Sequence, residues 1–123
     1  MDKFTSKVTY CNAELTTKEK IAFKDMNDAE QLNALATGEI ITVDKWGTIE
    51  VHNPKSENVD YMCTVIETPE GTKYKTSSNS FFNGISAIQE ELDVAGENGA
   101  FNIKIIKRQS KNNSGSYITC SLA

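Results

Sequence analysis

The segment from Phe101 to Ala123 constrains the fold more than any other part of the chain. It contains two runs in which apolar side chains recur at every second position, and a loop rich in Asn, Ser and Gly separates them. This period gives each strand one apolar face and one mixed face. Turn residues of this kind between two such runs are typical of a hairpin. The sequence therefore predicts a β-hairpin at residues 101–123.

The charge of this segment differs in sign from the charge of the rest. Residues 98–123 contain four basic residues and no acid, which gives +4. The remaining nine basic and seventeen acidic residues give −8, and the chain as a whole carries −4. A basic hairpin on an acidic protein indicates a local anion site. The alternative is a solvated hairpin tip with ordinary lysines.

Length and composition indicate one globular domain. The chain has 123 residues, of which 38% are hydrophobic and 24% charged, enough for a modest core. No run approaches the roughly 20 apolar residues of a membrane helix. The first ten residues, MDKFTSKVTY, lack the apolar stretch of a signal peptide. We therefore expect a cytosolic protein without membrane contact.

Cysteine and histidine offer little material for a metal, cofactor or catalytic site. Cys11, Cys63 and Cys120 are odd in number and far apart, and His52 is the single histidine. We expect three free thiols that act as small apolar side chains. We expect no metal and no cofactor.

Residues 1–38 are expected to form an appendage with short helices on a barrel that spans residues 39–123. Residues 4–10 are predicted as a short strand or a loose arm. Thr16 and Glu19 have capping-box spacing, which predicts a short helix to about Lys24. A second short helix is expected over 29–36, because Gly38 is a stop signal.

From residue 39 the pattern becomes β, with a first predicted strand that opens at 40–43, breaks at Trp46–Gly47 and resumes at 48–52. Two further strands are predicted at 59–67 and 72–77. A helix should follow from an N-cap within residues 78–80 and end at Gly96. Its apolar side chains form one stripe. They are Phe81, Ile85, Ile88 and Leu92.

The resulting order is three strands, a helix and two strands. This is the order of the OB-fold, a five-stranded Greek-key barrel with a helix between its third and fourth strands. A generic α+β sheet is the alternative. The expected fold is thus mainly β with α, within a single domain.

Catalysis is not expected. The chain contains no phosphate-binding or nucleophile-elbow motif. Asp44, Glu50 and Asp60 lie along strands without motif spacing, and Arg108 is the single arginine. A nuclease would need paired carboxylates for metal ions and several arginines. We therefore predict a protein that is not an enzyme.

Binding of a single strand agrees better with the sequence, because basic and aromatic residues alternate along it. Such binding combines a positively charged groove with aromatic rings on which bases stack. The alternative is that Trp46 is a core residue and that Tyr74 packs under the helix. The candidate nucleic-acid-binding residues are Trp46, Lys73, Tyr74, Lys75, Lys104, Lys107, Arg108, Lys111 and Tyr117.

Six features between Tyr61 and Leu122 recur in a known group of proteins. A strand ends in a turn with Gly71; Tyr74 precedes a Ser/Thr-rich run over 76–80; a helix with Ile and Leu follows. The strand FNIKIIK then leads to a Ser-Lys-Asn loop with Gly115 and to a last strand of aromatic, Thr and Ser residues. This layout, over about half of the chain, resembles the small single-stranded DNA-binding proteins of bacteriophages, especially those with protein-primed replication.

The resemblance implies an OB-like fold and binding of single-stranded DNA without sequence preference. It further implies a role in phage genome replication or recombination in the host cytoplasm. Lys107, Lys111 and Tyr117 would be contacts. The chain lacks the acidic tail of many such proteins, and residues 1–40 have no counterpart in them. For residues 1–40 there are two alternatives: self-association on DNA, or a separate interaction with phage or host replication proteins. The rival function is a protein-interaction module that adapts or inhibits a host factor through residues 89–93 and the N-terminal segment.

Overall fold

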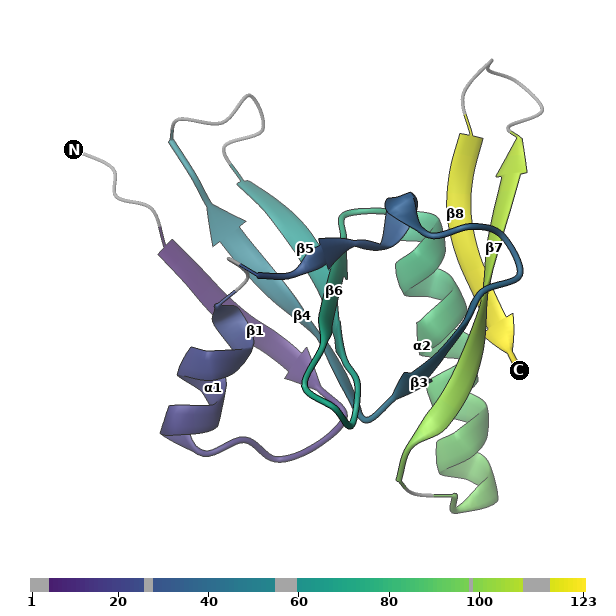
Figure 1. Ribbon diagram of the computed structural model, residues 1–123. Helices are drawn as coiled ribbons and strands as arrows, with labels where there is room; N and C mark the ends of the chain where they lie inside the picture. Colours follow the sequence, from purple (N-terminus) through teal and green to yellow (C-terminus); the bar gives the residue numbers. More distant parts are fainter. Residues whose placement is uncertain (1–4, 26–27, 55–59, 98, 110–115) are drawn as a thin grey trace.

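A computed structural model describes residues 5–25, 28–54, 60–97, 99–109 and 116–123. Within them the chain is mainly β, with two sheets and two α-helices (Figure 1). One sheet has the order β1-β4-β5-β6-β2, and the other has the order β3-β7-β8. The elements are β1 (Thr5–Cys11), α1 (Thr17–Lys24), β2 (Glu30–Gln31), the 3-10 turn η1 (Leu32–Ala34), β3 (Ile40–Val43), β4 (Lys45–His52), β5 (Asp60–Glu67), β6 (Lys73–Thr76), α2 (Asn79–Ala95), β7 (Phe101–Gln109) and β8 (Ser116–Leu122).

The chain passes from one sheet to the other between β3 and β4. Only Asp44 separates these strands, and its N–H donates to the Glu67 carbonyl at 2.9 Å. β3 pairs with β7, whereas β4 pairs with β5. The predicted break at Trp46–Gly47 is wrong, because both residues lie inside β4, opposite Ile66 and Val65. The interruption lies at Asp44, where the strand changes sheets.

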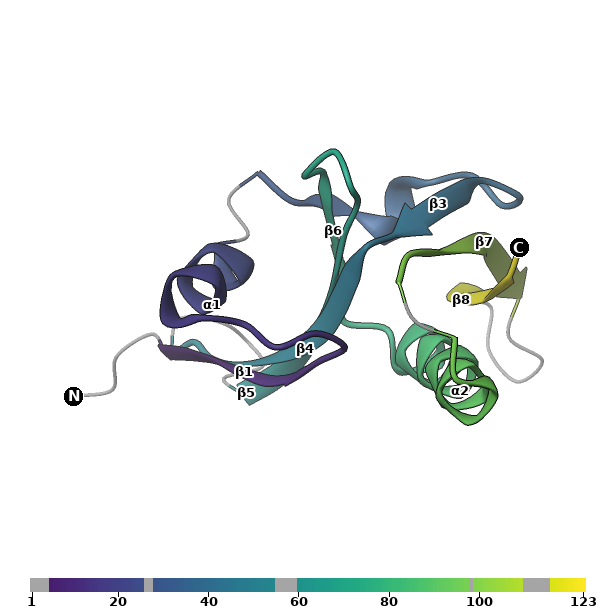
Figure 2. The same cartoon turned by 90° about the horizontal axis from the view of Figure 1, so that it is seen from below.

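The two sheets form an open arrangement, so the expected closed barrel is wrong. Closure of a barrel needs a continuous ring of paired strands, and no ladder joins β6 to β8 within the described residues. The helix α2 covers the outer edge of β8, where the Ser78 hydroxyl donates to the Ile118 carbonyl at 3.1 Å. Figure 2 shows α2 beneath β7 and β8, with the larger sheet to one side.

The helix α1 forms as the sequence predicts. The Glu19 N–H donates to the Thr16 hydroxyl at 3.2 Å, and the Thr16 N–H donates to the Glu19 carboxylate at 3.1 Å. The capping box is therefore complete. The bound Thr16 N–H lowers the pKa of Glu19.

The second helix expected over 29–36 is wrong. β2 pairs in parallel with β6 instead, and η1 follows it. Leu32 is completely buried, and the Asn33 side chain accepts a hydrogen bond from the Thr76 hydroxyl at 2.9 Å. These tertiary contacts override a weak local helix propensity.

Two apolar clusters form the core. The larger lies between the two sheets and α2, and it contains Leu32, Trp46, Ile66, Phe81 and Ile105. The smaller lies between α1 and the larger sheet, and it contains Phe23, Ile49, Val51, Cys63 and Val65. The described part of residues 1–38 therefore supplies one buried side chain to each cluster, Leu32 to the larger and Phe23 to the smaller. Partly buried side chains of the same part pack against the clusters as well: Leu35 on the larger, and Val8, Cys11 and Leu15 on the smaller.

The prediction for α2 is confirmed. The Ser78 hydroxyl accepts from the Phe81 N–H at 3.2 Å, and the helix ends at Gly96, whose φ of 70° is left-handed. Glycine adopts this conformation without a steric penalty. Of the predicted stripe, Phe81, Ile85 and Leu92 are buried, and Ile88 packs against the larger cluster.

Gly47 is a position where the fold tolerates no side chain. A Cβ there would lie 2.1 Å from the Tyr10 carbonyl oxygen of β1. We expect Gly47→Ala to force β1 away from β4 and to lower the free energy of unfolding by about 1–3 kcal/mol. Urea denaturation followed by circular dichroism measures this effect. Glu50→Ala, at an exposed position of β4, is the control; equal midpoints for the two variants would contradict the pairing of β1 over Gly47.

Candidate nucleic-acid interface

The candidate nucleic-acid-binding residues do not lie on one surface. Lys104, Arg108 and Tyr117 share the outer face of β7 and β8, whereas Lys73 and Lys75 lie on the α1 side of the larger sheet. Trp46 is buried, and Tyr74 packs against the larger cluster. Lys107 lies on the opposite face of β7, and Lys111 is outside the described residues.

The predicted C-terminal hairpin forms, and its outer face brings two cations and one ring together. The ladder places Arg108 opposite Tyr117 and Lys104 opposite Ser121. Opposed residues have Cβ atoms about 4.5–5.5 Å apart. Lys104 and Arg108 are four residues apart on one face, a separation of about 13 Å along the strand. Tyr117 is 38% exposed, so a base has access to its ring.

No acidic residue lies in this part of the chain. Residues 99–109 and 116–123 contain no Asp or Glu. Neither the Lys104 ammonium nor the Arg108 guanidinium makes a hydrogen bond or ion pair with another described residue, and both residues are exposed. Ile40, also exposed, lies opposite Lys104 on β3. The face therefore offers two cations without a partner among the described residues, within a partly apolar surface.

Lys107 connects β7 to the segment between β2 and β3. Its ammonium donates to the Asn33 carbonyl at 2.7 Å, and its N–H donates to the Thr37 hydroxyl at 3.2 Å. An ammonium group has three donors, so this bond leaves capacity for a phosphate. No sequence pattern indicates the roles of Asn33 and Thr37, because Asn33 lies in a segment with a helical pattern and Thr37 directly follows it.

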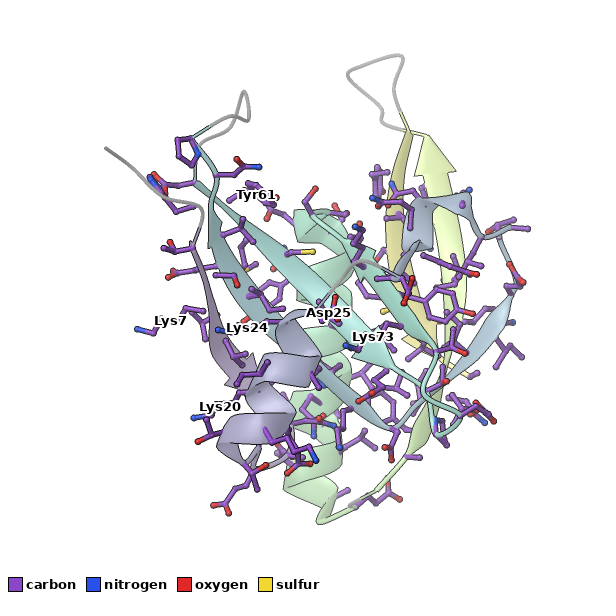
Figure 3. All side chains as sticks on the ribbon, turned by 60° about the vertical axis from the view of Figure 1, so that its left-hand side comes forward. Lys7, Lys20, Lys24, Asp25, Tyr61 and Lys73 are labelled. Carbon is purple, nitrogen blue, oxygen red and sulfur yellow. The ribbon has the colours of Figure 1, made fainter. Side chains whose placement is uncertain are left out.

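Lys73 is already engaged at the end of α1. Its ammonium donates to the carbonyls of Ala22 and Asp25, the second at 2.9 Å (Figure 3). A cation at a helix C-terminus interacts favourably with the helix dipole. Lys75 lies on the same face, half-buried and opposite Val65. Lys73 therefore serves the packing of α1 against the sheet.

Tyr74 faces away from the two lysines beside it in the sequence. It lies opposite Ile66, on the side of the larger cluster. Burial, followed by the carboxylates of Glu30, Glu39 and Glu70, raises the pKa of its hydroxyl. Because side chains alternate along a strand, a Lys-Tyr-Lys run places its ring and its charges on opposite faces.

Trp46 is held inside the protein. It is 2% exposed, and its indole N–H donates to the Gln89 side-chain oxygen at 2.9 Å. Its ring lies 5.0 Å from the Tyr10 ring and 6.4 Å from the Phe82 ring, between centroids. Its backbone N–H donates to the Asn12 side chain at 3.0 Å. The contact with Tyr10 crosses from β4 to β1 and has no local sequence signal.

The thiols and the clusters of charged side chains do not form a reactive or metal-binding site within the described residues. All three cysteines are free, and burial raises the pKa of Cys63 and raises that of Cys120 to about 12. Neither is a thiolate near neutral pH. Among the described residues, no three His, Cys, Asp or Glu side chains are grouped to hold a metal ion. In the same part of the chain, no helix is both long and apolar enough to span a bilayer.

Comparisons of the chain with protein-family models, curated proteins and solved structures found no match. The register, exposure and charge of the side chains described above are therefore the evidence for function.

Proposed function

We propose that this protein binds single-stranded DNA without sequence preference, through the outer face of β7 and β8. One observation carries the proposal: Arg108 and Tyr117 oppose each other on an exposed, acid-free face that also holds Lys104. Rings stack on bases of any identity, and cations neutralise phosphates. A face of this composition binds single strands through base stacking and charge, neither of which depends on sequence.

An open OB-like arrangement is the second part of the proposal. It is supported by the position of α2 between β6 and β7 and by the bent strand formed by β3 and β4, which pairs with β7 and then with β5. In OB-folds, the loop between the last two strands takes part in binding. Here that loop connects Arg108 to Tyr117 and contains Lys111 in the sequence.

The proposed role is to cover single strands during phage genome replication or recombination in the host cytoplasm, without catalysis. The resemblance of residues 61–122 to phage single-stranded DNA-binding proteins supports this role.

The test separates charge from stacking on the same face. Each phosphate neutralised on a single strand contributes about −0.7 to the slope of log K against log salt concentration. Replacing Lys104 and Arg108 together by alanine should therefore flatten the slope for oligo-dT by about 1–1.5. Tyr117→Ala should lower the affinity by about 1–3 kcal/mol and leave the slope almost unchanged. Fluorescence anisotropy of labelled oligo-dT at several salt concentrations measures both quantities.

The matched control removes the same charge elsewhere. Lys18 and Lys20 are exposed on α1, which packs on the side of the larger sheet away from β7 and β8 (Figures 1 and 3). Their double alanine variant should bind oligo-dT nearly as the unchanged protein does. Equal losses in the two double variants would indicate attraction by overall charge. Unchanged binding in all variants would exclude the outer face of β7 and β8 as the site.

A further inference from the structure

A cleft of about 420 Å³ lies between α2 and the strands β1 and β4. Its walls include the rings of Tyr10, Trp46 and Phe82 and the side chain of Val94. Tyr10 is 41% and Val94 82% exposed, although both are large apolar side chains. Exposed apolar surface within a concavity indicates a binding site for an apolar group.

The wall of this cleft is held in place by side-chain hydrogen bonds. The Trp46 indole donates to Gln89, and the Gln89 amide in turn donates to the Asp93 carboxylate at 2.9 Å. The Tyr10 ring packs on the indole from β1. A ligand would therefore meet a wall that is already ordered, which lowers the entropic cost of binding.

The rim of the cleft is acidic. Glu90 and Asp93 line it from α2, and no Lys, Arg or His is among the described residues that line it. Both carboxylates are exposed. Burial raises the pKa of the Tyr10 hydroxyl, and the negative charge of Asp93 adds to this shift, so the Asp93 carboxylate acts on the β1 side of the cleft as well. This potential repels phosphate and attracts a cationic partner.

We propose that this cleft docks a short segment of a partner protein, in which a large apolar side chain is flanked by Lys or Arg. The apolar side chain enters between Tyr10, Phe82 and Val94, and the basic neighbours face Glu90 and Asp93. The proposal is independent of nucleic-acid binding, because the outer face of β7 and β8 shares no residue with the cleft. The proposed docking site combines the N-terminal strand β1 and the acidic face of α2 in one surface.

Trp46 provides the signal for a direct test, because it is the single tryptophan and it lines the cleft. The probes are the peptides acetyl-Lys-Leu-Phe-Lys-amide and acetyl-Glu-Leu-Phe-Glu-amide, titrated into the full chain. The basic peptide should change the Trp46 emission in a saturable way. The acidic peptide should bind at least about tenfold more weakly, because two ion pairs become two repulsions.

Two variants on adjacent helix positions test the location. Ser86 lines the cleft, whereas its exposed neighbour Ala87 does not. Ser86→Phe should fill the cleft and abolish binding of the basic peptide, and Ala87→Phe should leave it unchanged. Glu90→Gln combined with Asp93→Asn should weaken binding about threefold to tenfold and remove most of its salt dependence.

Several results would overturn the proposal. These are no saturable signal with the basic peptide, equal binding of both peptides, or unchanged binding to Ser86→Phe. A loss of oligo-dT binding in Ser86→Phe would instead assign the cleft to nucleic acid. Self-association of the unchanged chain that Ser86→Phe abolishes, measured by sedimentation velocity, would assign it to a second copy.

Discussion

Replacing Trp46 by alanine is expected to lower the free energy of unfolding by about 3–5 kcal/mol, as for other fully buried large aromatic side chains. The indole is 2% exposed and packs between the rings of Tyr10 and Phe82. Its removal also leaves the Gln89 oxygen without its donor. Natural domains have about 5–15 kcal/mol of stability in total, so this variant should be close to unfolding.

Urea denaturation followed by far-ultraviolet circular dichroism measures this loss without a tryptophan signal. Trp46→Phe is the matched control, because it retains an aromatic ring and removes only the hydrogen bond and part of the volume. It should lose less stability than Trp46→Ala. A Trp46→Ala variant with unchanged stability and weakened oligo-dT binding would contradict the core role and restore the stacking role that the sequence also permits.

The parts of the fold that were predictable depend on local patterns. Ser78, the stripe from Phe81 to Leu92 and Gly96 define α2 because caps and periodicity act within a few residues. The hairpin of β7 and β8 follows for the same reason, since alternation fixes which side chains share a face. Within this hairpin, the ladder pairs Arg108 with Tyr117.

The parts that were not predictable depend on distant contacts. Nothing near Leu32 in the sequence indicates that it lies in the larger cluster, and its segment is short enough for tertiary contacts to replace a helix by β2 and η1. The bend at Asp44 likewise depends on its bond to the Glu67 carbonyl. The open arrangement of the sheets follows from the packing of these segments and of α2.

For the candidate interface, the alternation of side chains along a strand predicts which residues share a face of the sheet. It separates Tyr74 from Lys73 and Lys75, although their adjacency in the sequence suggested a joint site. The engagement of the Lys73 ammonium by α1 carbonyls joins residues about fifty positions apart. Such hydrogen bonds decide which cations remain available to bind an anion. They cannot be predicted from the spacing of residues in the sequence.

The adjacent residues Phe81 and Phe82 should respond very differently to alanine. Phe81 is completely buried in the larger cluster, whereas Phe82 is half-buried and lines the cleft. Phe81→Ala should lower the free energy of unfolding by about 3–5 kcal/mol, because it leaves a cavity among packed side chains. Phe82→Ala removes a ring with solvent on one side, so about 1–2 kcal/mol is expected.

Each variant thus serves as the control for the other, because residue type, helix and change of volume are the same. Urea midpoints determined side by side give the difference in stability. Phe82→Ala should also weaken binding of the basic peptide to the cleft, while Phe81→Ala, at temperatures where it is folded, should not. Equal losses of stability would contradict the orientation of α2. In the described orientation, the helical period places the Phe81 ring in the core and the Phe82 ring at the cleft, so the two losses should differ.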